Sequence, residues 1–172
     1  MSEYIFRNAV AGDIPFLADT VIAAEKSNSD KLGFTTLFNV PEAKAKELVT
    51  AMFEEEIEGC ELSVSSYIVV EYNEKAVAAF GGWIENFGEN MPSKILKSNL
   101  VGYTFGRESI EYLKERAYMI KDMIVEREPG ALQLEYLFVS EDHRGKKLAD
   151  GLIERLIKRG QEEYPSDRKS VV

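Results

Sequence analysis

The segment "GALQLEYLFVS", residues 130–140, constrains the fold more than any other part of the chain. It is apolar at nearly every position, which is typical of a central strand that is buried on both faces. A charged turn, "EDHRGKK", follows it, and then a helical pattern begins. The apolar stripe of that pattern consists of Leu148, Leu152, Ile153, Leu156 and Ile157. We therefore predict a central strand, a tight turn and a helix that starts near Lys146.

The turn concentrates basic side chains in an acidic chain. His143, Arg144, Lys146 and Lys147 lie within five residues, whereas the whole chain has 30 acidic and 21 basic residues and a net charge of −9. The first turn of a helix leaves backbone N–H groups without intrahelical partners, and the helix dipole makes that end partly positive. This arrangement favours a phosphate site.

The amides that would face such a phosphate run from Gly145 to about Asp150. The two common glycine-rich phosphate signatures, GxGxxG and GxxxxGK[ST], are both absent from the chain. From the local sequence alone, an equally valid interpretation is a solvated basic turn that balances Glu141 and Asp142. The turn by itself does not decide between the two.

The first third of the chain predicts one strand and two helices. The strand covers residues 4–10, and a helix follows with Asp13 as its cap and Pro15 in its first turn. The polar segment at residues 28–42 has no clear periodicity and is expected to be a loop. A second helix is expected over residues 42–58, with Gly59 at its end. Its apolar positions include Leu48, Met52 and Ile57.

The middle of the chain predicts a hairpin and then a long insertion. β-rich runs at residues 67–72 and 76–84 flank the polar turn "NEK". Residues 86–130 separate this hairpin from the central strand, and they contain a helical seam. The seam consists of Ile110, Leu113, Ala117, Ile120 and Ile124. Such a seam packs against its own domain or forms a subunit contact or a substrate lid.

Composition limits the class of protein. A chain of 172 residues with 45% hydrophobic content can bury one sizeable core, so residues 1–172 are expected to form a single domain. The acidic balance argues against a nucleic-acid surface. One Cys and one His give neither an intrachain disulfide nor a zinc spacing, so no metal is expected. Without a signal peptide or an apolar run of about 20 residues, we expect a soluble cytoplasmic protein that does not bind membranes.

The segment "VSEDHRGKKLA" resembles the acetyl-CoA motif of the Gcn5-related N-acetyltransferase superfamily (GNAT). Arg144 and Ala149 match the outer positions of that motif, and Gly145 is its common second residue, whereas Lys147 replaces its main glycine. The opening segment "IFRNAVAGDIPFLADTV" and the hairpin "YIVVEYNEKAVAAFGGWIE" are also similar to the first strand, first helix and hairpin of that family. The resemblance covers most of residues 4–160 apart from the insertion.

The resemblance implies an α/β fold, a GNAT-like mixed twisted β-sheet flanked by helices, and an acetyl-CoA-dependent N-acetyltransferase. The acceptor would be an amine of a small molecule or of a protein. The pantetheine of the co-substrate would lie along the strand, with its pyrophosphate at the turn. Carried over to this chain, the cofactor-binding residues are Leu137, Phe138, Val139, Arg144, Gly145, Lys146, Lys147, Leu148, Ala149 and Asp150.

Glu135 is the candidate catalytic base. An ammonium has no lone pair, so the acceptor must lose a proton before it attacks the thioester. Branches of the family that use a strand glutamate place it where this chain has Gln133, and Glu135 shares a strand face with that residue. The alternative, a carboxylate that only pairs with a helix cation, is about as well supported.

The C-terminal elements of the family have no counterpart in this sequence. In the family, a strand, a helix and a further strand normally follow the last helix, whereas here only "KSVV" could begin that next strand. No residue can be assigned as the acid that protonates the departing thiolate. We expect that a longer chain or a partner completes the sheet, with a homodimer as the candidate assembly, or that activity is lost. The competing function is a non-catalytic acyl-CoA-binding or protein-interaction module.

Residues outside the motif carry weaker expectations. His143 is expected to be an exposed turn residue, and Cys60 an inert thiol. Trp83, Phe80 and Phe87 could line an acceptor pocket, although aromatic residues of a hairpin more often belong to the core.

Overall fold

The computed structural model describes residues 3–27, 29–86, 91–121 and 125–163. Short 3₁₀ turns, labelled η, lie between the helices and strands. In chain order the elements are β1 (Ile5–Asn8), η1 (Ala11–Asp13), α1 (Ile14–Lys26), α2 (Gly33–Phe38), α3 (Glu42–Glu54), η2 (Val64–Ser66), β2 (Tyr67–Tyr72), β3 (Lys75–Ile84), α4 (Ser93–Arg116), η3 (Ala117–Met119), β4 (Leu132–Val139), η5 (Glu141–His143) and α5 (Leu148–Glu163).

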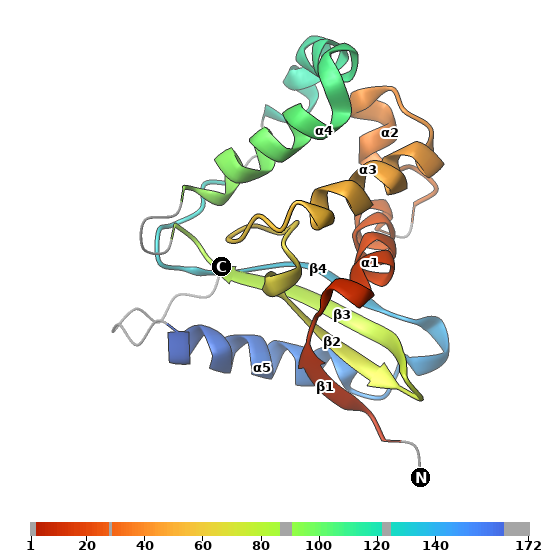
Figure 1. The fold of residues 1–172 in the computed structure, drawn as a ribbon, viewed down its shortest axis with the longest axis vertical. Coiled ribbons are helices and arrows are strands. Elements are labelled where there is room, and N and C mark those ends of the chain that lie inside the picture. Colours follow the sequence, from red (N-terminus) through yellow and green to blue (C-terminus); the bar gives the residue numbers. More distant parts are fainter. Residues whose placement is uncertain (1–2, 28, 87–90, 122–124, 164–172) are drawn as a thin grey trace.

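The strands form one antiparallel sheet in the order β1-β2-β3-β4 (Figure 1). Tyr67 pairs with Gly81 across the predicted hairpin, and Ala78 pairs with Val139 between β3 and β4. The expectation of a central position for β4 is wrong for the described chain, because β4 is the last strand of this sheet. Leu137 is accordingly 38% exposed.

Helices cover both faces of the sheet. Figure 1 shows α1 and α3 on one side and α5 on the other. The alternation of side chains along β2 explains this arrangement. Tyr67 and Val69 belong to the core under α1 and α3, whereas Ile68 and Val70 belong to the core under α5.

The segment between α1 and α3 contains a short helix, α2, where the sequence predicted a loop. Phe34 and Phe38 are four residues apart and therefore lie on one helix face. Both rings pack on Phe105 of α4, with centroids 5.9 and 4.2 Å from its ring. The loop prediction failed because the aromatic pair depends on a partner far along the chain. The next helix, α3, ends at Glu54, and Ile57 lies beyond it, exposed.

The insertion folds mainly as α4, a longer helix than the predicted seam. It begins at Ser93 and bends at Gly106, whose φ of 76° is not helical. Ile110 and Leu113 pack against the core shared by α1 and α3, so this part of the seam packs on its own chain. Ala117 is exposed beyond the end of α4, and Ile124 lies outside the described residues.

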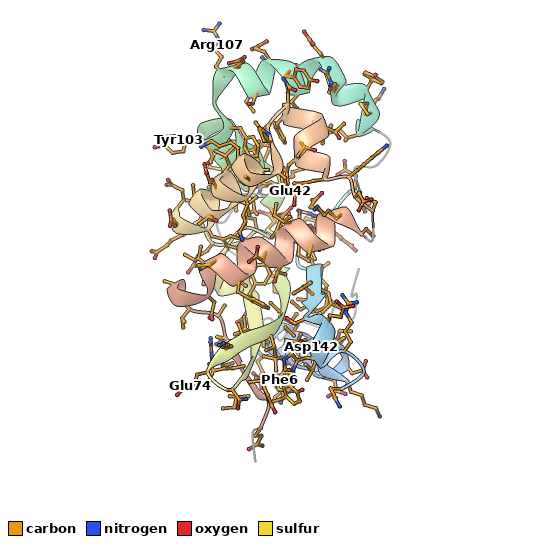
Figure 2. The ribbon with its side chains drawn as sticks, turned by 90° about the vertical axis from the view of Figure 1, so that its right-hand side faces the viewer. Phe6, Glu42, Glu74, Tyr103, Arg107 and Asp142 are labelled. Atoms are coloured by element: carbon orange, nitrogen blue, oxygen red, sulfur yellow. The ribbon has the colours of Figure 1, made fainter. Side chains whose placement is uncertain are left out.

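Figure 2 shows which residues lie toward the two ends of the long axis of the molecule. Tyr103 and Arg107 of α4 are at one end, and Asp142, in the turn after β4, lies toward the other. Among the helices that the structure describes, none combines the length and the apolar character that crossing a membrane requires.

Candidate functional site

The turn between β4 and α5 is built mainly from backbone hydrogen bonds. The Ser140 amide donates to the Val77 carbonyl (2.8 Å), which ties the end of β4 to β3. The Arg144 amide donates to the Glu141 carbonyl (3.2 Å) and closes the 3₁₀ turn η5. The helix starts at Leu148, two residues later than predicted. The amides at its first positions therefore have no partner within the helix.

Two residues of the turn have left-handed backbone conformations. Gly145 has φ +73° and Lys147 has φ +58°. The predicted helix start near Lys146 would place Lys147 inside the helix, whereas its backbone is not helical. A left-handed conformation costs an L-residue roughly 1–2 kcal/mol, and glycine avoids that cost. This is the position where the related motif has its main glycine, so Lys147 keeps a glycine-like backbone at the cost of strain.

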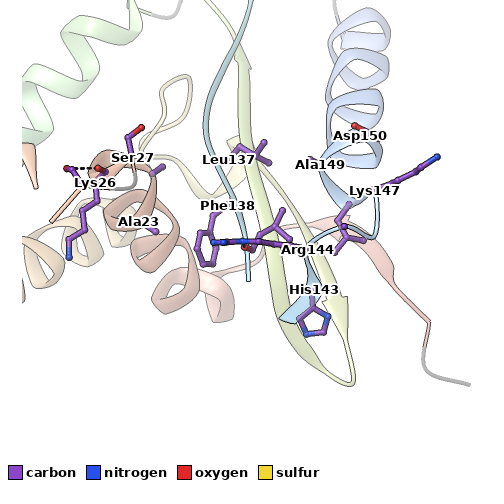
Figure 3. A pocket seen from close by; sticks show the side chains of 15 residues that line it. Ala23, Lys26, Ser27, Leu137, Phe138, His143, Arg144, Lys147, Ala149 and Asp150 are labelled. Carbon is purple, nitrogen blue, oxygen red and sulfur yellow. Dashed lines mark hydrogen bonds between the residues drawn. The ribbon is translucent and has the colours of Figure 1, made fainter. Parts of the chain in front are cut away.

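A hollow of about 870 Å³ lies beside this turn, with the end of α1 as its opposite wall (Figure 3). All of the predicted cofactor-binding residues line it except Lys146. In Figure 3 the side chain of Arg144 extends across β4 toward Phe138, whereas that of Lys147 points away from both. Ala23 and Lys26 of α1 belong to the opposite wall. The sequence did not identify this helix end as part of the site.

His143 anchors the turn and is half-buried rather than exposed, contrary to expectation. Its Nδ1 lies 3.0 Å from the hydroxyl of Tyr4, which precedes β1. The imidazole also packs edge-on against Tyr72 of β2, with ring centroids 5.2 Å apart. The ring therefore connects the turn to the opposite edge of the sheet.

A β-bulge interrupts β4 next to the hollow. Ala79 pairs with Phe138 and Gly81 pairs with Glu135, so Tyr136 and Leu137 together face the single residue Phe80. Tyr136 has φ +59°. A bulge of this kind turns neighbouring side chains toward the same region, although neighbours in a regular strand point to opposite faces.

Because of the bulge, Glu135 and Tyr136 join one charged cluster. Arg127 pairs with Glu135 and also with Glu61, at 3.3 Å. Lys97 of α4 pairs with Glu61 at 2.8 Å and donates to the Tyr136 hydroxyl at 3.4 Å. The Tyr136 hydroxyl in turn donates to Glu25 of α1 (2.8 Å). We call Glu25, Glu61, Lys97, Arg127, Glu135 and Tyr136 the charged cluster.

The two carboxylates that share Arg127 have opposite pKa shifts. Burial raises the pKa of Glu61, whose side chain is 0% exposed, but Lys97 and Arg127 outweigh burial and hold that pKa below its ordinary value. For Glu135, burial and the negative charge of Glu61 together raise the pKa, and Arg127 and Lys97 offset them only partly. Glu135 therefore holds a proton more readily than an exposed glutamate does.

The sequence identified Glu135 but missed most of its surroundings. Its cation is Arg127, from the segment before β4, and not a residue of a helix. The sequence signal that could have revealed Glu61 is a single charge between the apolar residues Cys60 and Leu62. Both neighbours are fully buried in the structure. Gln133, on the same strand, is buried, and its Nε2 has no hydrogen-bond partner among the described residues.

The remaining candidates belong to the core. Cys60 is buried, and burial raises the pKa of its thiol to about 11, which disfavours the nucleophilic thiolate. Trp83 and Phe80 are buried. The Arg127 guanidinium lies 5.1 Å from the centre of the Trp83 ring. Phe87 is outside the described residues.

Comparisons with known proteins agree with this geometry. A sequence profile of the acetyltransferase (GNAT) family matches residues 35–168. A crystal structure described as an acetyltransferase has a TM-score of 0.63 and 18% identity, with 92% of this chain and 75% of that chain covered. An N-acetyltransferase from Staphylococcus aureus Mu50 has a TM-score of 0.58 and 13% identity, covering 90% and 75%.

A more distant match is the aminoglycoside N-acetyltransferase AAC(6')-Iy in complex with coenzyme A, with a TM-score of 0.47 and 11% identity over 95% of this chain and 72% of that chain. Among curated proteins, no sequence matches the chain significantly. The two stronger structural matches confirm the predicted fold class, a mixed α/β fold with its sheet flanked by helices.

Proposed function

The chain belongs to the acetyltransferase (GNAT) family, and we propose that it is an acetyl-CoA-dependent N-acetyltransferase whose acceptor is an amine of a small molecule or of a protein. Acetyl-CoA is the co-substrate of this family. The observation that carries the proposal is the hollow beside the turn after β4, which almost all of the predicted cofactor-binding residues line.

In this proposal the pyrophosphate of acetyl-CoA binds at the turn. The amides from Gly145 to Asp150 would bind it, and all of these residues except Lys146 line the hollow. Arg144 adds a positive charge that reaches over β4. The pantetheine follows the backbone of residues 137–139, where β4 is the last strand of the described sheet and its outer edge is available. Lys146 and Lys147 contribute through their backbone amides. The Lys147 side chain, which points away, contributes only long-range charge.

The chemistry is direct transfer. Glu135 removes a proton from the acceptor ammonium, and the freed amine nitrogen attacks the thioester carbonyl. A backbone N–H of β4 stabilises the oxyanion that develops there. This attack forms the C–N bond. As the tetrahedral intermediate collapses, the C–S bond breaks, the nitrogen gives up its second proton to solvent, and coenzyme A leaves as a thiolate that takes a proton from solvent.

Measuring the release of free thiol from acetyl-CoA with a panel of primary amines tests this function. We expect amine-dependent release by the wild-type chain. Glu135→Gln should lower that release while coenzyme A affinity stays unchanged, because Glu135 does not line the hollow. Tight coenzyme A binding without release for any amine would instead favour the alternative, a non-catalytic acyl-CoA-binding module.

We also propose that residues 1–172 form one domain that pairs with a second copy as a homodimer. In support, α4 packs on the same core as α1 and α3, and no described strand pairs with the outer edge of β4. The second copy would pair with the first half of this edge, residues 132–135, because pantetheine follows residues 137–139. An open strand edge favours pairing with another strand. Light scattering should give the mass of a dimer, and a monomer at all concentrations would contradict the pairing.

A further inference from the structure

The guanidinium of Arg127 is fixed from several directions. It donates to both carboxylate oxygens of Glu61, at 3.3 and 3.5 Å, and to the Ser93 hydroxyl at 2.6 Å. Ser93, at the start of α4, is itself held by Glu85, which accepts its amide (2.9 Å) and its hydroxyl (2.6 Å). These contacts hold the guanidinium in the orientation in which it also pairs with Glu135.

Glu135 is the accessible end of this arrangement. Its side chain is 31% exposed, whereas those of Arg127 and Glu61 are 18% and 0% exposed. A solvent-borne amine can therefore reach the carboxylate of Glu135 but not that of Glu61. The planar fork of an arginine binds carboxylates in a fixed geometry, which a lysine does not reproduce.

We propose that Arg127 is a positioning residue for acetyl transfer: anchored by Glu61 and Ser93, it holds the carboxylate of Glu135 in one orientation at the bulge of β4. This inference rests on the proposed function, in which Glu135 is the base. It explains why a buried carboxylate, Glu61, is present at all, because Glu61 balances the charge of the arginine that orients Glu135.

The same geometry makes the reaction depend on pH in a defined way. Arg127 favours the ionised form of Glu135, and Glu61 opposes it. Removing Arg127 should therefore make Glu135 ionise only at higher pH. Four other titratable groups act on Glu135 or belong to the charged cluster, one each from α1, β2, α4 and β4. In that order they are Glu25, Tyr67, Lys97 and Tyr136.

The test compares Arg127→Gln and Arg127→Lys with the control Lys94→Gln. Lys94 is an exposed cation near the start of α4 and pairs with the exposed Glu126. The readouts are kcat/KM for the acceptor as a function of pH and KM for acetyl-CoA. We expect Arg127→Gln to move the acid limb of the kcat/KM profile, where activity falls as the pH drops, upward by roughly 1–3 pH units. It should also lower activity at neutral pH. Arg127→Lys should move it less, and Lys94→Gln should match wild type.

A second variant covers the case in which Arg127→Gln does not fold. Arg127→Gln combined with Glu61→Gln removes one cation and one anion, so the buried charges stay balanced. Because Glu135 then loses an attracting and a repelling charge together, the acid limb of its pH profile should stay within about 1 pH unit of wild type. Activity at neutral pH should still fall, because nothing orients the Glu135 carboxylate. KM for acetyl-CoA should stay at the wild-type value in every variant.

The outcomes separate the two proposals. Turnover by the wild-type chain, with an acid limb that stays in place in Arg127→Gln or with undiminished activity in the double variant, would overturn this inference alone. The absence of acetyl transfer by the wild-type chain to every amine tested would overturn the proposed function, and this inference with it.

Discussion

The turn after β4 and the charged cluster flank the same strand but are built in different ways. The turn uses the backbone of consecutive residues, 140–150, and most of it is exposed. The charged cluster uses side chains from separate segments, and Glu61 at its centre is fully buried. We infer that changes in the turn alter affinity with little effect on stability, whereas changes in the cluster alter stability and pH dependence.

The largest effect should come from Glu61→Gln. This change removes the fully buried carboxylate that the half-buried cations of Lys97 and Arg127 share. Breaking a buried ion pair by removing one partner typically costs about 3–5 kcal/mol. Urea unfolding should show a loss of this size. The matched control is Glu111→Gln on α4, because Glu111 is exposed and pairs with the exposed Lys114; its loss should be below about 1 kcal/mol.

Glu61 also predicts how stability depends on pH. Its pKa is lower in the folded chain than in the unfolded chain, so its contribution is complete above the ordinary carboxyl pKa and is lost as the pH falls through the folded value. Glu135, whose pKa is raised, acts in the opposite direction. Wild-type stability should therefore fall more steeply than that of Glu61→Gln on acidification. Parallel curves would show that Glu61 does not carry the dependence.

An intermediate effect is expected from Gly145→Asp in the turn. The new carboxylate would face the phosphates, so coenzyme A affinity should fall roughly 10- to 100-fold, or about 1.4–2.8 kcal/mol. A Cβ at this position meets no atom within 4 Å, so the change adds no clash. Two controls isolate the charge. Gly145→Ala adds only the strain of a left-handed residue, and Gly12→Asp adds the charge at a distant open site.

Calorimetric titration measures these affinities. Equal losses for Gly145→Asp and Gly145→Ala would attribute the effect to backbone strain and not to a bound phosphate. An equal loss in Gly12→Asp would attribute it to net charge alone.

The smallest effect should come from Lys147→Gly. Glycine adopts the left-handed conformation of this position without strain. We expect the free energy of unfolding to rise by about 1 kcal/mol relative to Lys147→Ala, which removes the same side chain but keeps the strain. Thermal or urea unfolding of the two variants measures the difference. Equal stabilities would mean that the turn imposes no strain on Lys147.

The sequence predicted the turn much better than the cluster, for a physical reason. Strand, turn and helix follow one another along the chain, so the predicted cofactor-binding residues were identified together. The cluster forms only when Glu61, Lys97 and Arg127 meet across the fold, and no local pattern reveals that meeting. The bulge at Tyr136 was also unforeseen, since regular alternation placed it on the face opposite Glu135. The helix α2 was missed for the same reason, because Phe34 packs against distant Phe105.

The most direct test of the central claim is hydrogen–deuterium exchange of the wild-type chain with and without coenzyme A. Bound coenzyme A should slow exchange of the amides in residues 137–139 and 145–150. Amides in the charged cluster should be little changed, because coenzyme A does not contact them. Protection confined to another part of the chain, or no binding by the folded protein, would contradict the account.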